Sequence, residues 1–255
     1  MGSKPPIVLS IAGYDPSAGA GLLADLKTFA AIGVYGMACV TALTVQSTQG
    51  VRRVEPVLAD IVGQMLQSLA EDVSFSAIKV GMLGSGEVAA VVFDWLSSQN
   101  GVPVVLDPVF ISTSGKDLLD AAGTDRLRQQ GLARTDWITP NLAELAVLTQ
   151  SAPAESCNQI EEAAGLLQQM AGAVGNPDIK IVVTGGDAKK PDDLLLTREG
   201  FRWFPGEHIE TISTHGTGCT FSSALAARLA FGDGEVAAVQ FAKDYVTAAI
   251  RHAYP

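Results

Sequence analysis

The chain has 255 residues, of which 47% are hydrophobic and 17% charged, and its formal net charge is −10. A chain of this length can bury a substantial core, and so few charges are typical of a compact protein with buried strands. The acidic balance excludes a basic surface for nucleic acid or an anionic membrane, so we expect a small-molecule substrate. Three scattered cysteines exclude a disulfide framework or a zinc site. With no secretory leader and no bilayer-spanning apolar run, a cytoplasmic location is expected.

Strand-like and helix-like segments alternate from one end of the chain to the other. The expected strands are 7–12, 37–46, 51–57, 77–80, 102–106, one that ends at 137–140, 179–183, 194–198 and 201–204. The expected helices are 21–32, 60–69, 87–96, one that opens at 141, 160–170, and two that begin at 217 and 235. The last two strands flank Glu199-Gly200 and are expected to form an antiparallel hairpin.

These repeated strand–helix units predict one α/β domain over residues 1–255, with helices on both faces of a mostly parallel sheet. In such sheets ligands bind beyond the carboxyl ends of the strands. Polar or glycine residues stand at those ends: Gly13, Asp15, Gln46, Gly81, Asp107, Asn141 and Thr184.

The segment 214–220 carries the sharpest chemical signal. Its glycines, Gly216 and Gly218, come directly before an apolar run expected to be a buried helix. Glycines let the backbone approach an anion, and a helix start adds unpaired N–H groups and the positive end of a dipole. The same field would stabilise the thiolate of Cys219. The motif therefore predicts chemistry on a phosphate beside a reactive thiol, while His215 fits either a phosphate donor or an exposed loop residue.

The segment 19–24 fits the glycine pattern of a dinucleotide-binding turn. No acidic residue follows between Asp25 and Glu55, where the ribose partner should stand, and the preceding loop is too long. Dinucleotide binding is therefore disfavoured. The chain also lacks the phosphate-binding P-loop and the Gly-x-Ser-x-Gly elbow.

Asn141 and Glu144 have two interpretations. Taken singly, they fit a helix capping box, in which an N-cap side chain and an acid three residues later bond to each other's backbone. With Asp107, they also follow strands expected at one sheet edge, where carboxylates would suit Mg²⁺ bound to nucleotide phosphates. The segment 184–186 is either a turn or a backbone contact to a nucleotide.

Nine short stretches occur in one order over nearly the whole chain: IAGYDPSAGAG (11–21), ADLKTF (24–29), VYG (34–36), TALTVQ (41–46), KVGML (79–83), VLDPV (105–109), ITPNLAE (138–144), VTGG (183–186) and THGTGCT (214–220). In this combination the chain resembles the hydroxymethylpyrimidine/phosphomethylpyrimidine kinases of the ribokinase-like superfamily. The resemblance implies a three-layer α/β/α fold with a central, mostly parallel sheet. It also implies ATP-dependent phosphorylation of a pyrimidine hydroxymethyl group in thiamine biosynthesis, and a homodimer.

The resemblance assigns roles to individual positions. The implied pyrimidine-binding residues are Gly13, Asp25, Gln46, Met82 and Val109, and those implied for ATP are Asn141, Thr184 and Gly186. Asp107 and Glu144 would serve Mg²⁺. Gly216, Thr217 and Gly218 would form an anion hole for the transferred phosphoryl group. Cys219 would accept the alcohol proton, at a position where sugar kinases carry an aspartate.

Three departures from the family pattern bear on a second phosphorylation. Thr184-Gly-Gly-Asp187 stands where the family often has Lys-Gly-Gly-His, the segment 110–115 lacks a frequent lysine, and the Gly-His-Gly-rich tail is missing. These changes remove cations near an already anionic substrate. We therefore expect the first phosphorylation to be retained and leave the second open.

Two alternative functions remain beside the pyrimidine kinase. One is a pyridoxal kinase of the cysteine type, although such kinases tend to carry a second cysteine that is missing between Val109 and Ser114. The other is a catalytically idle protein that binds a vitamin precursor, against which the intact Gly-x-Gly-Cys motif and both acidic positions argue.

Overall fold

The computed structural model describes residues 4–112, 114–185, 191–211 and 214–253. One nine-stranded sheet runs through this part of the chain in the order β3-β2-β1-β4-β5-β6-β7-β8-β9. The strands are β1 (Ile7–Tyr14), β2 (Tyr35–Ser47), β3 (Gly50–Pro56), β4 (Ala77–Val80), β5 (Val104–Leu106), β6 (Trp137–Ile138), β7 (Lys180–Val183), β8 (Asp193–Thr197) and β9 (Gly200–Phe204). The helices are α1 (Gly21–Ile32), α2 (Ala59–Asp72), α3 (Gly86–Leu96), α4 (Ala121–Arg126), the π-helical turn η1 (Leu127–Gly131), α5 (Leu132–Arg134), α6 (Leu142–Thr149), α7 (Cys157–Ala173), α8 (Thr217–Ala230) and α9 (Glu235–Arg251).

In sheet order, the six strands β2-β1-β4-β5-β6-β7 pair in parallel. At the two edges, β3, β8 and β9 pair antiparallel with their neighbours. The predicted hairpin is β8–β9. Because the six parallel strands point the same way, their carboxyl ends lie along one edge of the sheet.

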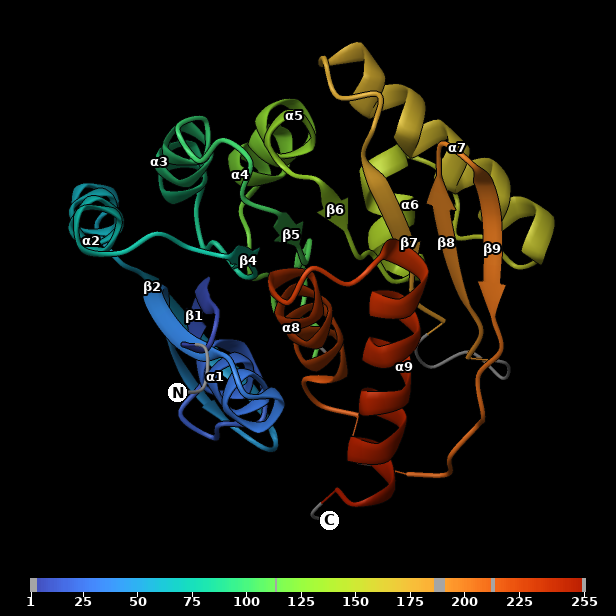
Figure 1. Cartoon of the computed structure of the whole chain (residues 1–255), viewed down its shortest axis with the longest axis horizontal. Helices are drawn as coiled ribbons and strands as arrows, with labels where there is room; N and C mark the ends of the chain where they lie inside the picture. Colours follow the sequence, from blue (N-terminus) through green and yellow to red (C-terminus); the bar gives the residue numbers. More distant parts are fainter. Residues whose placement is uncertain (1–3, 113, 186–190, 212–213, 254–255) are drawn as a thin grey trace.

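Helices cover both faces of the sheet, with α1, α8 and α9 on one face and α2, α3, α6 and α7 on the other (Figure 1). Alternating side chains of one strand enter different cores, as expected for a strand buried on both faces. In β1, Leu9 and Ile11 join the core under α2 and α3, while Val8 joins the core under α8 and α9. The predicted three-layer architecture with a mostly parallel sheet is confirmed.

The sequence analysis missed the helical stretch α4–η1–α5. Gly123 and Gly131 lower the helix propensity of this segment, and so no helix was expected there. The structure gives a packing reason for Gly131, since a Cβ at this position would lie 2.9 Å from Cζ of Phe93 in α3. Asp120 caps the stretch by accepting a hydrogen bond from the N–H of Gly123. Other boundaries differ by up to three residues at a helix end. In the described part of the chain, we find no helix with the length and hydropathy required to cross a membrane.

Candidate active site

A cavity of about 490 Å³ opens at the carboxyl ends of the parallel strands. Twelve of the fourteen residues predicted for the site line it: Gly13, Gln46, Met82, Asp107, Val109, Asn141, Glu144, Thr184, Gly216, Thr217, Gly218 and Cys219. Asp25 does not line the cavity, and Gly186 lies outside the described residues, as does Asp187. Tertiary folding therefore gathers residues from seven separate segments around one space.

The amino-terminal turn of α8 forms one wall of the cavity. Gly216 precedes the helix with φ = 78°, and a Cβ there would lie 1.9 Å from the carbonyl oxygen of Gly19. A Cβ at Gly19 would in turn lie 2.6 Å from Cδ2 of His215. These glycines let the loop after β1 and the loop before α8 touch, which explains the glycine pattern at 19–24 without a dinucleotide.

Asp25 lies in a buried cluster beneath the cavity and not on its wall. Its carboxylate accepts hydrogen bonds from Lys79, from the hydroxyl of Ser10 at 2.5 Å and from the hydroxyl of Ser223 at 2.8 Å. Neither Asp25 nor Lys79 has any exposed side-chain surface. The prediction that Asp25 touches the pyrimidine is therefore corrected, because the cluster occupies both carboxylate oxygens.

Lys79 links this cluster to the cavity. Burial alone would lower the pKa of its ammonium group, but the charge and hydrogen bond of Asp25, together with the charge of Asp107, raise it overall. Its Nζ lies 3.8 Å from Oδ2 of Asp107, which lines the cavity. The sequence analysis assigned Lys79 no role, since nothing local distinguishes a buried lysine within a strand.

The environment of Cys219 differs from the expectation. Burial raises the pKa of its thiol to about 12, although Lys79 and a hydrogen bond from the backbone N–H of Gly21 act in the opposite direction. The carboxylates of Asp107 and Asp25 raise the pKa further. The predicted stabilisation of the thiolate by the helix start is therefore wrong for the protein without ligands. The thiol also hydrogen-bonds to Asp107.

The capping box at Asn141 is confirmed. The side chain of Asn141 accepts a hydrogen bond from the N–H of Glu144, and Oε2 of Glu144 accepts one from the N–H of Asn141, both at 2.9 Å. Glu144 nevertheless lines the same cavity as Asp107. Burial and the nearby charge of Asp107 raise the pKa of Glu144 to about 8. Burial likewise raises the pKa of Asp107 despite the charge of Lys79.

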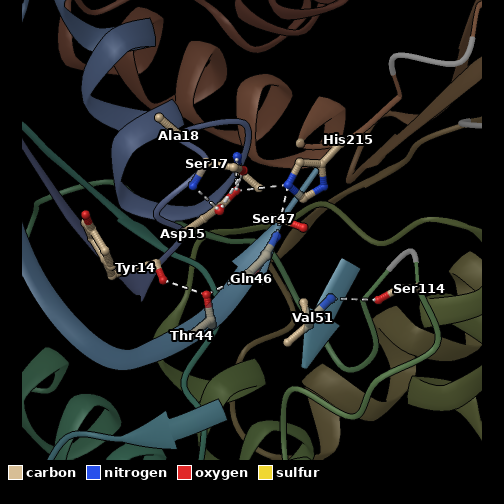
Figure 2. Close-up of polar contacts among 12 residues, drawn as sticks. Tyr14, Asp15, Ser17, Ala18, Thr44, Gln46, Ser47, Val51, Ser114 and His215 are labelled. Carbon is tan, nitrogen blue, oxygen red and sulfur yellow. Dashed lines mark hydrogen bonds and ion pairs between the residues drawn. The ribbon is translucent and has the colours of Figure 1, made fainter. Parts of the chain in front are cut away.

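Apolar residues and a polar network both line the cavity. Met82 packs over Gly13, and with Val109 it belongs to a small apolar cluster around Ala42 and Leu118. On the polar side, His215 Nε2 lies 2.9 Å from Oδ2 of Asp15 and 3.1 Å from the carboxamide of Gln46 (Figure 2).

A second cavity of about 200 Å³ adjoins the first at the start of α8. The two share Thr184, Thr214, Thr217 and Gly218. A buried ion pair lines it, in which Nζ of Lys243 in α9 lies 2.9 Å from Oδ2 of Asp193. Oδ1 of Asp193 accepts a hydrogen bond from the N–H of Gly185. The sequence analysis missed Lys243 because it lies in an amphipathic helix with no motif around it.

A comparison of the sequence with protein families identifies a match over almost the whole chain. A family model described as phosphomethylpyrimidine kinase matches residues 15–255. The chain belongs to the phosphomethylpyrimidine kinase family. The predicted resemblance and the ribokinase-like fold are thereby confirmed.

Curated relatives of this phosphomethylpyrimidine kinase family member are of two lengths. The hydroxymethylpyrimidine/phosphomethylpyrimidine kinase of Aquifex aeolicus is 37% identical over 96% of this chain and 94% of its own length. The thiamine biosynthesis multifunctional protein ThiED of Corynebacterium glutamicum is 40% identical over 97% of this chain. The chain spans only 32% of the length of that multifunctional protein.

Solved structures similar to this family member include two named kinases. The phosphomethylpyrimidine kinase of Clostridium difficile matches with a TM-score of 0.82 and 33% identity, over 96% of this chain and 99% of the other. The pyridoxal kinase of Staphylococcus aureus in complex with pyridoxal matches with a TM-score of 0.88 and 30% identity, over 99% and 90%. The fold alone therefore does not separate the two activities.

Proposed function

We propose that this chain transfers the γ-phosphoryl group of ATP to the hydroxymethyl group of 4-amino-5-hydroxymethyl-2-methylpyrimidine in thiamine biosynthesis. The observation that carries the proposal is the position of the α8 start, where the larger and the smaller cavity meet. An alcohol in the larger cavity and a nucleotide reaching from the smaller one would meet at Gly216, Thr217 and Gly218. Phosphoryl transfer depends chiefly on such positioning and on charge stabilisation.

The larger cavity suits an aromatic ring with one polar edge. Val109 and Met82, which packs over Gly13, offer an apolar slot for the ring. The carboxamide of Gln46 both donates and accepts, which suits the adjacent amino group and ring nitrogen of an aminopyrimidine. Asp25 acts through its charge and its bonds to Lys79, without contacting the substrate.

The nucleotide would lie along the other side of the α8 start. Asn141, Thr184 and Gly186 are proposed to contact ATP, and the smaller cavity bounded by the Lys243–Asp193 pair offers space for its base. The smaller cavity supports this placement because it shares Thr217 and Gly218 of the proposed anion hole with the larger cavity.

The residues present fit Mg²⁺ that is held jointly by protein carboxylates and by the phosphates of a bound nucleotide. Across the described residues, no three His, Cys, Asp or Glu side chains gather to hold a metal ion alone. Asp107 and Glu144 line one cavity, and burial together with the nearby charge of Asp107 raises the pKa of Glu144 to about 8. Magnesium typically takes one or two carboxylates, with phosphate and water oxygens as its other ligands. When bound, it would neutralise phosphate charge.

Cys219 is proposed as the base. The substrate hydroxyl oxygen forms the new bond to the γ-phosphorus, the bond from phosphorus to ADP breaks, and the hydroxyl proton passes to the sulfur. Only the thiolate can accept that proton, and with a thiol pKa of about 12 the thiolate is a minor species at neutral pH. Its fraction rises tenfold per pH unit below 12, so we expect kcat to rise with pH when the chemical step limits turnover.

A pyridoxal kinase is the second candidate, favoured by the similarity to the solved Staphylococcus aureus enzyme. The test measures ATP consumption with the hydroxymethylpyrimidine, its monophosphate and pyridoxal in turn. We expect the pyrimidine to have the highest kcat/KM. A higher value for pyridoxal would reassign the activity, and tight binding with no turnover of any of them would favour an idle binding protein.

The second phosphorylation is tested in the same assay. Since Thr184 and Asp187 replace a cation and an imidazole of the family pattern, we expect slower turnover of the monophosphate than of the alcohol. Equal turnover would contradict an impaired second step. A homodimer of single-domain chains in the cytoplasm remains the family expectation, which light scattering on the purified protein would test for the oligomeric state.

A further inference from the structure

Asp15 is held as an acceptor of hydrogen bonds. Its carboxylate accepts bonds from the N–H and the hydroxyl of Ser17 and from the N–H of Ala20, at 2.7 to 2.9 Å. Burial acts to raise the pKa of this carboxyl, but these bonds and that from His215 lower it overall. Asp15 is therefore ionised at neutral pH and has no proton to donate.

The role of His215 Nε2 follows from this contact. The nitrogen lies 2.9 Å from Oδ2 of Asp15, and a carboxylate oxygen at that distance needs a donor. Nε2 must then carry a hydrogen, whether the ring is neutral or charged. Gly19 lies directly against the ring, since a Cβ at that position would lie 2.6 Å from Cδ2 of His215.

The two ends of the Gln46 carboxamide can be assigned from their partners. One terminal atom lies 3.1 Å from His215 Nε2, and the other lies 3.1 Å from Oγ1 of Thr44. Because Nε2 of His215 carries a hydrogen and has no lone pair, it cannot accept from an NH₂ group. The atom facing it is therefore the carboxamide oxygen, which shares the single Nε2 hydrogen with Asp15. Oγ1 of Thr44 lies 2.9 Å from the carbonyl oxygen of Tyr14, which can only accept, so the single hydroxyl hydrogen points there.

Thr44 must then accept from Gln46, and the atom facing it is the NH₂ group. Both ends give the same answer, opposite to the orientation drawn in Figure 2. Oxygen and nitrogen of a carboxamide are assigned by such a network of partners. The relay runs from Tyr14 through Thr44, Gln46 and His215 to Asp15, with the single Nε2 hydrogen of His215 shared between Gln46 and Asp15.

We propose that His215 is a positioning residue that fixes the orientation of the Gln46 carboxamide and thereby the order of donor and acceptor presented to the substrate. The inference rests on the proposed function, in which Gln46 meets the amino edge of a pyrimidine. A fixed carboxamide offers its remaining N–H and its remaining lone pair at set positions. In a 4-aminopyrimidine, the amino group would donate to the carboxamide oxygen and the adjacent ring nitrogen would accept from the carboxamide N–H. The 4-oxo analogue, with N–H beside a carbonyl, presents the reverse order.

The experiment compares kcat/KM for the 4-amino substrate and its 4-oxo analogue in four proteins. These are the wild type, His215→Phe, His215→Gln and the control His252→Phe, which alters an exposed histidine at the end of α9. We expect the wild type and the control to prefer the 4-amino substrate by at least about a hundredfold, since a mismatched buried polar pair is costly. In His215→Phe the preference should fall at least tenfold, mainly through KM. His215→Gln should recover part of it, because its amide can donate to the same neighbours.

Thr44→Val provides a second variant that frees the other end of the carboxamide and should lower the preference in the same direction. Thermal unfolding of each variant distinguishes loss of specificity from loss of folded protein. A wild type that does not phosphorylate the 4-amino substrate overturns the proposed function, and this inference with it. An active wild type whose preference is unchanged in His215→Phe and Thr44→Val overturns the inference alone.

Discussion

Nζ of Lys79 lies 3.0 Å from both carboxylate oxygens of Asp25, and neither side chain is exposed to solvent. The ion pair joins β4 to α1, and through Ser223 it also joins α8, beneath the floor of the cavity. A buried ion pair contributes little compared with an apolar replacement of both partners, but removing one partner leaves a buried charge.

We therefore expect Asp25→Asn to lower the free energy of unfolding by about 3–5 kcal/mol. The control Glu55→Gln breaks the exposed pair of Glu55 with Arg53 in β3 and should change stability by only about 0.5 kcal/mol. Urea denaturation of both variants measures the difference. Equal small losses would mean that the Lys79 charge is compensated by Asp107 alone.

The three cysteines should react with iodoacetamide at different rates. Cys157 is exposed, whereas burial raises the thiol pKa of Cys39 and of Cys219 to about 12. Because the thiolate is the nucleophile, we expect Cys157 to be alkylated first at pH 8, Cys219, which is half-buried in the cavity wall, much more slowly, and Cys39 only after unfolding in urea. Peptide mass spectrometry follows each site. Rapid alkylation of Cys219 in the folded protein would contradict its assigned environment.

Glu144 should make stability depend on pH. Its pKa of about 8 in the folded protein lies above the ordinary 4.5, so the folded state binds the proton more tightly than the unfolded chain. The contribution of Glu144 protonation to the free energy of unfolding is thus fully present below about pH 4.5 and is lost as the pH rises through about 8. Glu144→Gln keeps an oxygen for the N–H of Asn141 but carries no charge. We expect this variant to be more stable than the wild type at pH 8, by an amount on the order of 1 kcal/mol or more, with a smaller difference at pH 5.

The same comparison with Mg²⁺ and ATP added tests the proposed metal role of Glu144. Ligands that bind the ionised carboxylate stabilise the wild type by mass action. The stability gain of Glu144→Gln at pH 8 should then shrink or reverse. A variant that is less stable than the wild type at pH 8 in the absence of ligands would contradict the raised pKa.

Two glycine substitutions separate backbone strain from steric overlap. Gly216 and Gly200 both have positive φ, at 78° and 107°, but a Cβ at Gly200 would meet nothing within 4 Å. We expect Gly200→Ala to cost about 1–3 kcal/mol of stability with kcat/KM unchanged. Gly216→Ala should cost more and lower kcat/KM at least a hundredfold, because its Cβ would displace the loop at Gly19. Similar activity in the two variants would show that the close approach at Gly216 is dispensable.

Local patterns in the sequence determined much of this protein. The glycines before Thr217 marked the start of α8, Asn141 with Glu144 marked a capped helix, and Asp107 marked a strand end. Each of these signals depends on neighbouring residues, through period, caps or turn geometry, so it can be read without the fold.

Tertiary structure decided what depends on burial or on distant partners. Lys79 meets Asp25 from 54 residues away, and His215 meets Asp15 from 200 residues away, contacts that no local pattern encodes. The helix start beside Cys219 could be predicted from the sequence, but the loss of hydration and the carboxylates of Asp107 and Asp25, which raise the pKa of its thiol, could not. The sequence thus identified the segments that meet at the site, while packing decided which of their side chains face the cavity and with what charge.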